Sequence, residues 1–175
     1  DACRTAASVA GQVRAVTALL GLQILYGALV AGLKAGFAYN TFPLMSGQWI
    51  PEGAWQLAPA WVNLVENPAT VQFVHRLLAW TLLAFGIWLW HTLRVHGLGR
   101  RANLLLAALG LQFLLGVLTI LHMPQQPVLW GAIHQAGAVA AGPAGGGDQR
   151  RADLRVRGGV QRGPWDIVPP PREGE

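Results

Sequence analysis

The chain has 175 residues, of which 53% are hydrophobic and only 12% are charged. Soluble domains carry about 25% charged residues, so this composition argues against a soluble globular protein. The net charge of +5 does not indicate a nucleic-acid-binding protein either, because six of the thirteen basic residues follow residue 149, and the five acidic residues at 148–175 nearly balance them. The composition predicts a protein of the lipid bilayer.

Four apolar stretches are predicted to form helices, at residues 13–33, 71–93, 102–121 and 128–141. The runs 77–93 and 102–121 contain no Asp, Glu, Lys or Arg, and a helix needs about 17–25 predominantly apolar residues to cross a bilayer. The fourth stretch is shorter than a full crossing. We therefore predict an all-α integral membrane protein in which residues 13–141 form a four-helix transmembrane bundle, after an N-terminal segment at 1–12.

The distribution of basic residues predicts how the helices are oriented. Arginines precede the first helix and occur three times between the second and third helices, whereas the two other loops contain one lysine in all. Because basic loops stay on the cytoplasmic or matrix side, residues 1–12 and the 94–101 link are expected inside. The 34–70 and 122–127 loops are expected outside. We expect a multi-pass protein of a bacterial inner (plasma) membrane, with the mitochondrial inner membrane as the alternative.

The tail at residues 142–175 differs in composition from the rest of the chain. It begins with glycine, proline and alanine, continues with an arginine-rich stretch and contains three consecutive prolines. Such a composition cannot form a membrane helix or a packed core, so we predict a disordered tail. We also hypothesise that the reading frame changes near residue 141, where the apolar helix stops. An intact frame on resequencing the DNA would refute this hypothesis.

Two histidines in the second and fourth predicted helices are the main candidates for function. His75 lies about four residues into its helix and His134 about six residues into its own, and both helices run from outside to inside. At about 1.5 Å per residue, both imidazoles lie roughly 6–9 Å below the outer surface. Two imidazoles at equal depth can ligate a haem iron from both sides. The alternative is that each histidine only forms hydrogen bonds with neighbouring helices.

The residues around the two histidines suggest further roles. Several residues that share a helical face with one of the histidines are small: Ala79, Gly86, Gly131, Gly137, Ala138 and Ala141. A flat face of this kind would admit a porphyrin, although small residues also serve helix packing. Arg76 is expected either to extend to the outer surface or, as we favour, to contact a haem propionate. His122 is expected to neighbour the haem or to cap its helix, and His91 and His96 to lie at the inner interface.

Several segments resemble one known family. They read Gly-Ala-Leu-Val-Ala-Gly at 27–32, Ala-Gly-Phe-Ala-Tyr-Asn-Thr-Phe-Pro-Leu-Met at 35–45, Glu-Asn-Pro-Ala-Thr-Val-Gln-Phe-Val-His-Arg at 66–76 and His-Gln-Ala-Gly-Ala at 134–138. The first two resemble the fifth helix and following loop of haem A synthases, the COX15/CtaA family. The third resembles the start of that family's sixth helix and the fourth its eighth helix. The resemblance covers roughly residues 10–141.

The resemblance implies a fold and an activity. Haem A synthases are eight-helix proteins with two similar four-helix halves, each with a histidine pair. They oxidise the C8 methyl of haem O to the formyl of haem A for cytochrome c oxidase assembly. The matched segments are those of the C-terminal half, so the parent protein is expected to be an oxidoreductase. Because the family's first four helices are not in this sequence, the chain alone is expected to be inactive.

The resemblance also implies site residues, a cofactor and partners. His75 and His134 match the axial ligands of a haem b that passes electrons. The N-terminal half of the family has a glutamate three residues before its histidine, whereas Gln72 occupies that position here, which fits a haem-holding half. Because the resemblance places the substrate site in the other half, no catalytic residue is assigned. The expected partners are the lipid bilayer, haem O bound by the N-terminal half, haem O synthase and a second copy of the chain. No nucleic acid is expected.

Two other functions fit the same residues. One is a membrane b-type cytochrome that uses a bis-histidine haem in electron transfer; haem O or haem A among the extracted pigments would favour the synthase instead. The other is a non-haem membrane protein, such as part of a transporter, in which the histidines only bond neighbouring helices. The spectrum of a six-coordinate low-spin haem would exclude that function.

Overall fold

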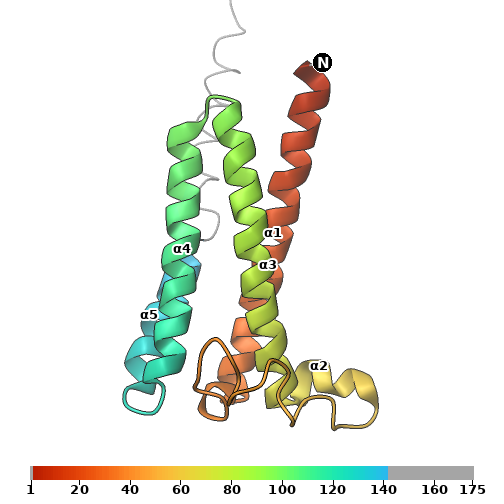
Figure 1. Cartoon of the computed structure of the whole chain (residues 1–175), viewed down its shortest axis with the longest axis vertical. Helices are drawn as coiled ribbons and strands as arrows, with labels where there is room; N and C mark the ends of the chain where they lie inside the picture. The colour runs from red at the N-terminus through yellow and green to blue at the C-terminus, as the bar shows by residue number, and fades with distance from the viewer. Residues whose placement is uncertain (1, 142–175) are drawn as a thin grey trace, which may run out of the picture. The chain divides into compact units, whose positions relative to one another are not determined.

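A computed structural model describes residues 2–141, which fold almost entirely into helices (Figure 1). The elements in chain order are α1 (Ala2–Gly32), η1 (Ala35–Phe37), η2 (Ala60–Val62), α2 (Asn63–Glu66), α3 (Pro68–Val95), α4 (Gly99–His122) and α5 (Pro127–Ala141). This part of the chain contains no strand, only one isolated antiparallel bridge between Met45 and Gln48. The tail predicted to be disordered, 142–175, lies outside the described residues.

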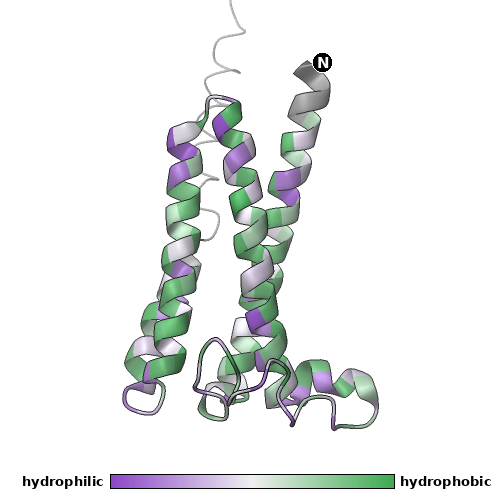
Figure 2. Cartoon of the chain, in the orientation of Figure 1, coloured by the Kyte–Doolittle hydropathy of each residue, from purple (hydrophilic) through white to green (hydrophobic). Residues whose placement is uncertain are grey.

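Three helices are long and apolar enough to cross a membrane. The spans are Ala7–Gly32, Pro68–Val95 and Gly99–His122, with mean hydropathies of 1.8, 1.4 and 2.5. Hydrophobic residues follow the length of these helices (Figure 2), and outward-facing leucines are more than half exposed, as a lipid-facing surface requires. The predicted all-α integral membrane fold is confirmed. The fourth helix, α5, has 15 residues, fewer than the about 20 needed for a full crossing.

The helix boundaries differ from the prediction mainly at the N-terminus. Helix α1 begins at Ala2, whereas the apolar pattern predicted a start near residue 13. The stretch 2–12 is rich in alanine and contains no proline, so it continues the helix although it is less apolar. The described part of the chain also contains three short elements that the sequence did not predict, η1, η2 and α2, within the loop between α1 and α3.

Helices that follow one another in the chain pack side by side. Helix α1 packs on α3, α3 on α4, and α4 on α5, with the loops before α3 and before α5 at the same end of the helices (Figure 1). The prediction that these two loops share one side therefore agrees with the fold. At the other end, Val16, Leu82 and Leu89 form a buried cluster against α4.

A network of side-chain amides fixes the start of α3. Asn67 is the N-cap residue, and its Oδ1 accepts hydrogen bonds from the backbone amides of Ala69 and Thr70. Its Nδ2 donates to the Gly53 carbonyl and to Asn63 Oδ1. Because Asn67 is buried and bonded on both sides, it ties the preceding loop to the first turn of the helix. Pro68 then occupies the first helical position, which suits its missing N–H group.

Candidate functional site

His75 and His134 lie at matching depth in the two helices that begin at the loop end of the fold. Each histidine follows, by seven residues, the proline that begins its helix: Pro68 for α3 and Pro127 for α5. At about 1.5 Å per residue, each imidazole is about 10 Å along its helix. The two histidines therefore lie equally far along their helices, as the sequence predicted, and each is a few residues further from the helix start than predicted.

The His75 ring lies between two residues of α1. The Nε2 atom of Gln23 lies 3.3 Å from His75 Nε2, within hydrogen-bonding distance. One turn later, Gly27 leaves room for the ring, because a Cβ atom at that position would lie 3.3 Å from His75 Cε1. The other ring nitrogen, Nδ1, is buried and has no hydrogen-bond partner. His75 thus has one nitrogen held by the protein and one without a partner.

The His134 ring has the same kind of surroundings, provided by α4. Gln112 Nε2 lies 3.2 Å from His134 Nδ1 and also donates a 2.8 Å hydrogen bond to the His134 carbonyl. A Cβ atom at Gly116, one turn later, would lie 3.1 Å from His134 Cε1 and 3.5 Å from its Nε2. The glutamine therefore engages Nδ1, and Nε2 forms no hydrogen bond within the described part of the chain.

The two glutamines and two glycines belong to a short repeat that the sequence analysis missed. The pattern Gly-Leu-Gln-x-Leu-x-Gly occurs at 21–27 and again at 110–116. In both copies the last glycine is four residues after the glutamine, so both face the same neighbour. This repetition is the sequence signal that identifies the two glutamines and the two glycines.

The helices that carry the two histidines do not pack extensively on each other. Among residues 2–141, helix α5 makes extensive contacts only with α4. No group of three or more His, Cys, Asp or Glu side chains in the same region is placed to hold a metal ion.

The predicted flat face of small residues is only partly correct. A Cβ atom at Gly86 would lie 2.5 Å from Leu109 Cδ1, and one at Gly137 would lie 2.5 Å from Gln112 Oε1. These two glycines therefore allow close packing of α3 and α5 on α4, which is the alternative stated for them. Gly131 has no neighbour within 4 Å. The glycines that touch the imidazoles are instead on the neighbouring helices.

Arg76 holds the loop that follows α1. Its NH2 group donates to the Tyr39 carbonyl at 2.8 Å, and its NH1 group donates to the Thr41 carbonyl at 2.8 Å. Gln72, one turn earlier, donates to the same Tyr39 carbonyl at 2.9 Å. The sequence did not predict this role, because it requires residues more than 30 positions away. Of the three guanidinium nitrogens of Arg76, Nε is buried and has no hydrogen-bond partner. The contact between Arg76 and a haem propionate stays a prediction.

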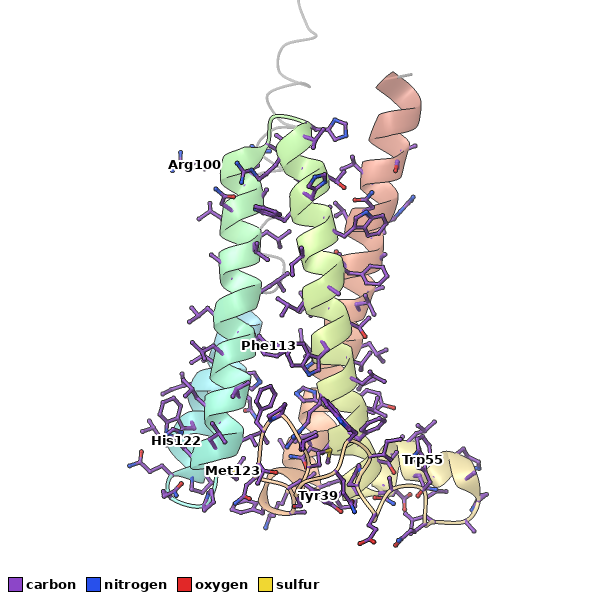
Figure 3. The ribbon with its side chains drawn as sticks, in the orientation of Figure 1. Tyr39, Trp55, Arg100, Phe113, His122 and Met123 are labelled. Carbon is purple, nitrogen blue, oxygen red and sulfur yellow. The ribbon has the colours of Figure 1, made fainter. Side chains whose placement is uncertain are left out.

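Loop side chains cover the end of the helices nearest the histidines. Phe42 of the loop, Trp80 of α3 and Phe113 of α4 form an aromatic cluster, with ring centroids 4.8–6.2 Å apart. His122 caps the end of α4 through a hydrogen bond from Nδ1 to the Leu118 carbonyl at 2.9 Å. Its ring stacks on Trp130 at 4.7 Å. Figure 3 shows Phe113 and His122 on α4 and Tyr39 in the loop.

Residues 1–141 match the COX15-CtaA family, described as cytochrome oxidase assembly protein. The chain belongs to this family. It is 48% identical over 134 residues to the heme A synthase of Sinorhizobium medicae, an alignment that covers 71% of this chain and 35% of the relative. It is 45% identical over 135 residues to the heme A synthase of Rhizobium meliloti, covering 74% of this chain and 36% of the relative. No solved structure matches.

Membership of the COX15-CtaA family confirms the resemblance drawn from the sequence motifs. The matched region includes all four residues of the repeated arrangement and both histidines. The bacterial sources of the relatives agree with the predicted bacterial membrane location. The chain spans about a third of the length of the curated relatives it matches.

Proposed function

We propose that His75 and His134 bind one haem b through both faces of its iron, and that the chain forms the haem-holding, C-terminal half of a protein that makes haem A. The observation that carries the proposal is the pair of imidazoles at equal depth in α3 and α5, each held by a glutamine at one nitrogen. The relatives are named heme A synthase. By that likeness, the whole protein oxidises the C8 methyl of haem O to a formyl group.

The residues present fit such a group. A buried polar atom without a hydrogen bond costs about 1–3 kcal/mol, and His75 Nδ1 is such an atom. A metal ligand bond would remove this cost. When bound, a haem b would supply one-electron transfer. The chain's own contribution is to hold two neutral imidazoles at one level, to keep α3 and α5 apart by packing both against α4, and to cover the site with the Arg76-bound loop.

The reacting methyl group of haem O is proposed to bind elsewhere in the whole protein. At the position three residues before His75 stands Gln72, whose Nε2 donates to the Tyr39 carbonyl. An amide that holds a loop has no proton to exchange, so it supplies no acid or base for methyl oxidation. For this reason no residue of the chain is proposed as catalytic.

The test is the haem content of histidine variants. The chain purified in a mild detergent is expected to show the sharp reduced bands of a six-coordinate low-spin haem, and His75→Ala and His134→Ala are each expected to lose them. His91→Ala is the matched control, because His91 lies on the same helix as His75 but is exposed near its other end. Full haem content in both histidine variants would contradict the proposal. Haem O or haem A among the pigments extracted from the whole protein would support the synthase rather than a b-type cytochrome.

A further inference from the structure

We propose that Gln23 and Gln112 are positioning residues, which together with Gly27 and Gly116 set the orientation of the two histidine rings toward the haem. The inference rests on the proposed function, because it assigns a role to residues around the proposed ligands. None of the four residues is suggested as a ligand itself. Each acts through the imidazole that it touches.

The same device occurs twice, on two different helices. Gln23 of α1 lies 3.3 Å from Nε2 of His75, and Gln112 of α4 lies 3.2 Å from Nδ1 of His134, so the residue types are repeated although the engaged nitrogen differs. In each case, the glycine four residues later would place a Cβ 3.1–3.3 Å from Cε1 of the same ring. Because the spacing Gln-x-x-x-Gly places the two residues on one helical face, each ring lies against both an amide side chain and a stretch of helix backbone that carries no Cβ.

A glutamine side chain within a membrane helix requires an explanation, because a buried amide is costly unless its atoms are bonded. Gln23 Oε1 is buried and has no hydrogen-bond partner. A packing role would be filled better by leucine, which surrounds both glutamines in the repeat. The unsatisfied oxygen indicates that the amide is placed for its chemistry toward the ring.

A glutamine amide can form a hydrogen bond with a histidine ring nitrogen whether that nitrogen accepts or donates. Glutamine has both a donor nitrogen and an acceptor oxygen. It can therefore donate to the nitrogen of a neutral ring, as the distances here indicate, or use its oxygen to accept the N–H of a ring whose other nitrogen binds a metal. Histidines that bind metals almost always donate their second N–H to such an acceptor, which fixes the ring and raises its basicity.

The glycines complete the arrangement by admitting the ring edge. Any side chain at Gly27 or Gly116 would meet Cε1 closer than an ordinary van der Waals contact. The ring can therefore approach the backbone of the neighbouring helix only because both positions lack a Cβ. Together the amide lies against one ring nitrogen and the glycine against Cε1, and these two contacts restrict how the ring can turn.

The experiment replaces each glutamine in two ways in the full chain. Gln23→Met and Gln112→Met keep the length of the side chain but remove the hydrogen bond, and each is expected to lower haem affinity by about 10–100-fold. The midpoint potential of the haem that remains is expected to rise, because the imidazole becomes a weaker electron donor to the ferric iron. Gln23→Glu and Gln112→Glu retain an acceptor and are expected to keep the haem, with a lower potential. Gln135→Met is the control, since Gln135 is exposed beside His134.

The outcomes separate this inference from the proposed function. If the unmodified chain binds haem and the histidine variants lose it, but the methionine variants keep the original affinity and potential, the glutamines have no positioning role and the inference is wrong. If a methionine variant does not fold, the potential of the glutamate variant decides, and an unchanged value overturns the inference. If the unmodified chain binds no haem, the proposed function fails and the inference fails with it.

Discussion

Replacing Gly116 by alanine tests whether the His134 ring packs against α4. The added Cβ would lie 3.1 Å from His134 Cε1, whereas ordinary contacts begin at about 3.4 Å. The ring must therefore move by at least about 0.3 Å, the difference between these distances, and such overpacking costs about 1–3 kcal/mol. Alanine is also the better helix former by about 1 kcal/mol. The net expectation is a free energy of unfolding lowered by about 0–2 kcal/mol.

Gly110→Ala is the matched control for this prediction. Gly110 is in the same helix and has no neighbour within 4 Å, so it gains the helix propensity without the overpacking. The difference between the two variants isolates the contact with the ring, at about 1–3 kcal/mol. Unfolding in detergent, followed by far-UV circular dichroism, measures the difference. Electron paramagnetic resonance of the ferric haem reports whether the ring has turned.

A second pair of variants tests whether the loss of stability depends on how close the added Cβ comes to the ring. The Cβ of Gly27→Ala would lie 3.3 Å from His75 Cε1, which requires a shift of only about 0.1 Å, and Gly32→Ala on the same helix has no neighbour within 4 Å. The effect relative to the control is therefore expected to be smaller at Gly27 than at Gly116. Equal stability of Gly116→Ala and Gly110→Ala, together with unchanged haem spectra, would refute the packing of the imidazole on the helix backbone.

Three further variants test the contacts around the site. Asn67→Ala is expected to lower the free energy of unfolding by about 1–3 kcal/mol, because it removes the α3 cap and leaves the Gly53 carbonyl without its donor; thermal unfolding would measure this. Gly86→Ala is expected to be less stable than Gly110→Ala by about 1 kcal/mol in the same assay, because its Cβ would lie 2.5 Å from Leu109 Cδ1, the end of a flexible side chain that must shift. Arg76→Met is expected to release the Tyr39–Leu44 loop, seen as several-fold faster cleavage there by a protease.

Each of these three predictions would be contradicted by a specific result. Unchanged stability of Asn67→Ala would mean that the cap does not hold the loop. Gly110→Ala again serves as the control for Gly86→Ala, and equal stability would exclude close packing at Leu109. For Arg76→Met the control is Arg100→Met, since Arg100 is exposed at the other end of the helices (Figure 3). If both arginine variants are cleaved at the same rate, Arg76 does not restrain the loop.

The sequence predicted the long helices well and the short ones not at all. The runs 71–93 and 102–121 correspond to α3 and α4, which extend beyond them by one to three residues at each end. An apolar stretch that crosses a bilayer must satisfy its own backbone hydrogen bonds, and a helix does so. Helix α2 has four residues, too few for any periodicity to appear. It forms because buried Asn63 bonds the Leu57 amide and carbonyl, a contact that depends on the folded loop.

The candidate site was predictable in depth but not in its surroundings. Counting residues from the start of a helix gives the level of His75 and His134, since the rise per residue is constant. Spacing along a helix shows which residues of that helix share a face. It does not show which residues of a neighbouring helix will contact that face. Arg76 shows the same limit, because its partners are loop carbonyls whose position depends on the fold of residues 39–44.

The repeated seven-residue pattern accounts for the similar surroundings of the two histidines. Helices α1 and α4 carry the same pattern, and each presents its glutamine and glycine to the next long helix in the chain. The histidine then follows its helix-starting proline by the same seven residues in both cases. The glutamines meet different ring nitrogens, Nε2 of His75 and Nδ1 of His134. Repeating one helix pair therefore places two histidines against the same residue types, with no residue shared between them.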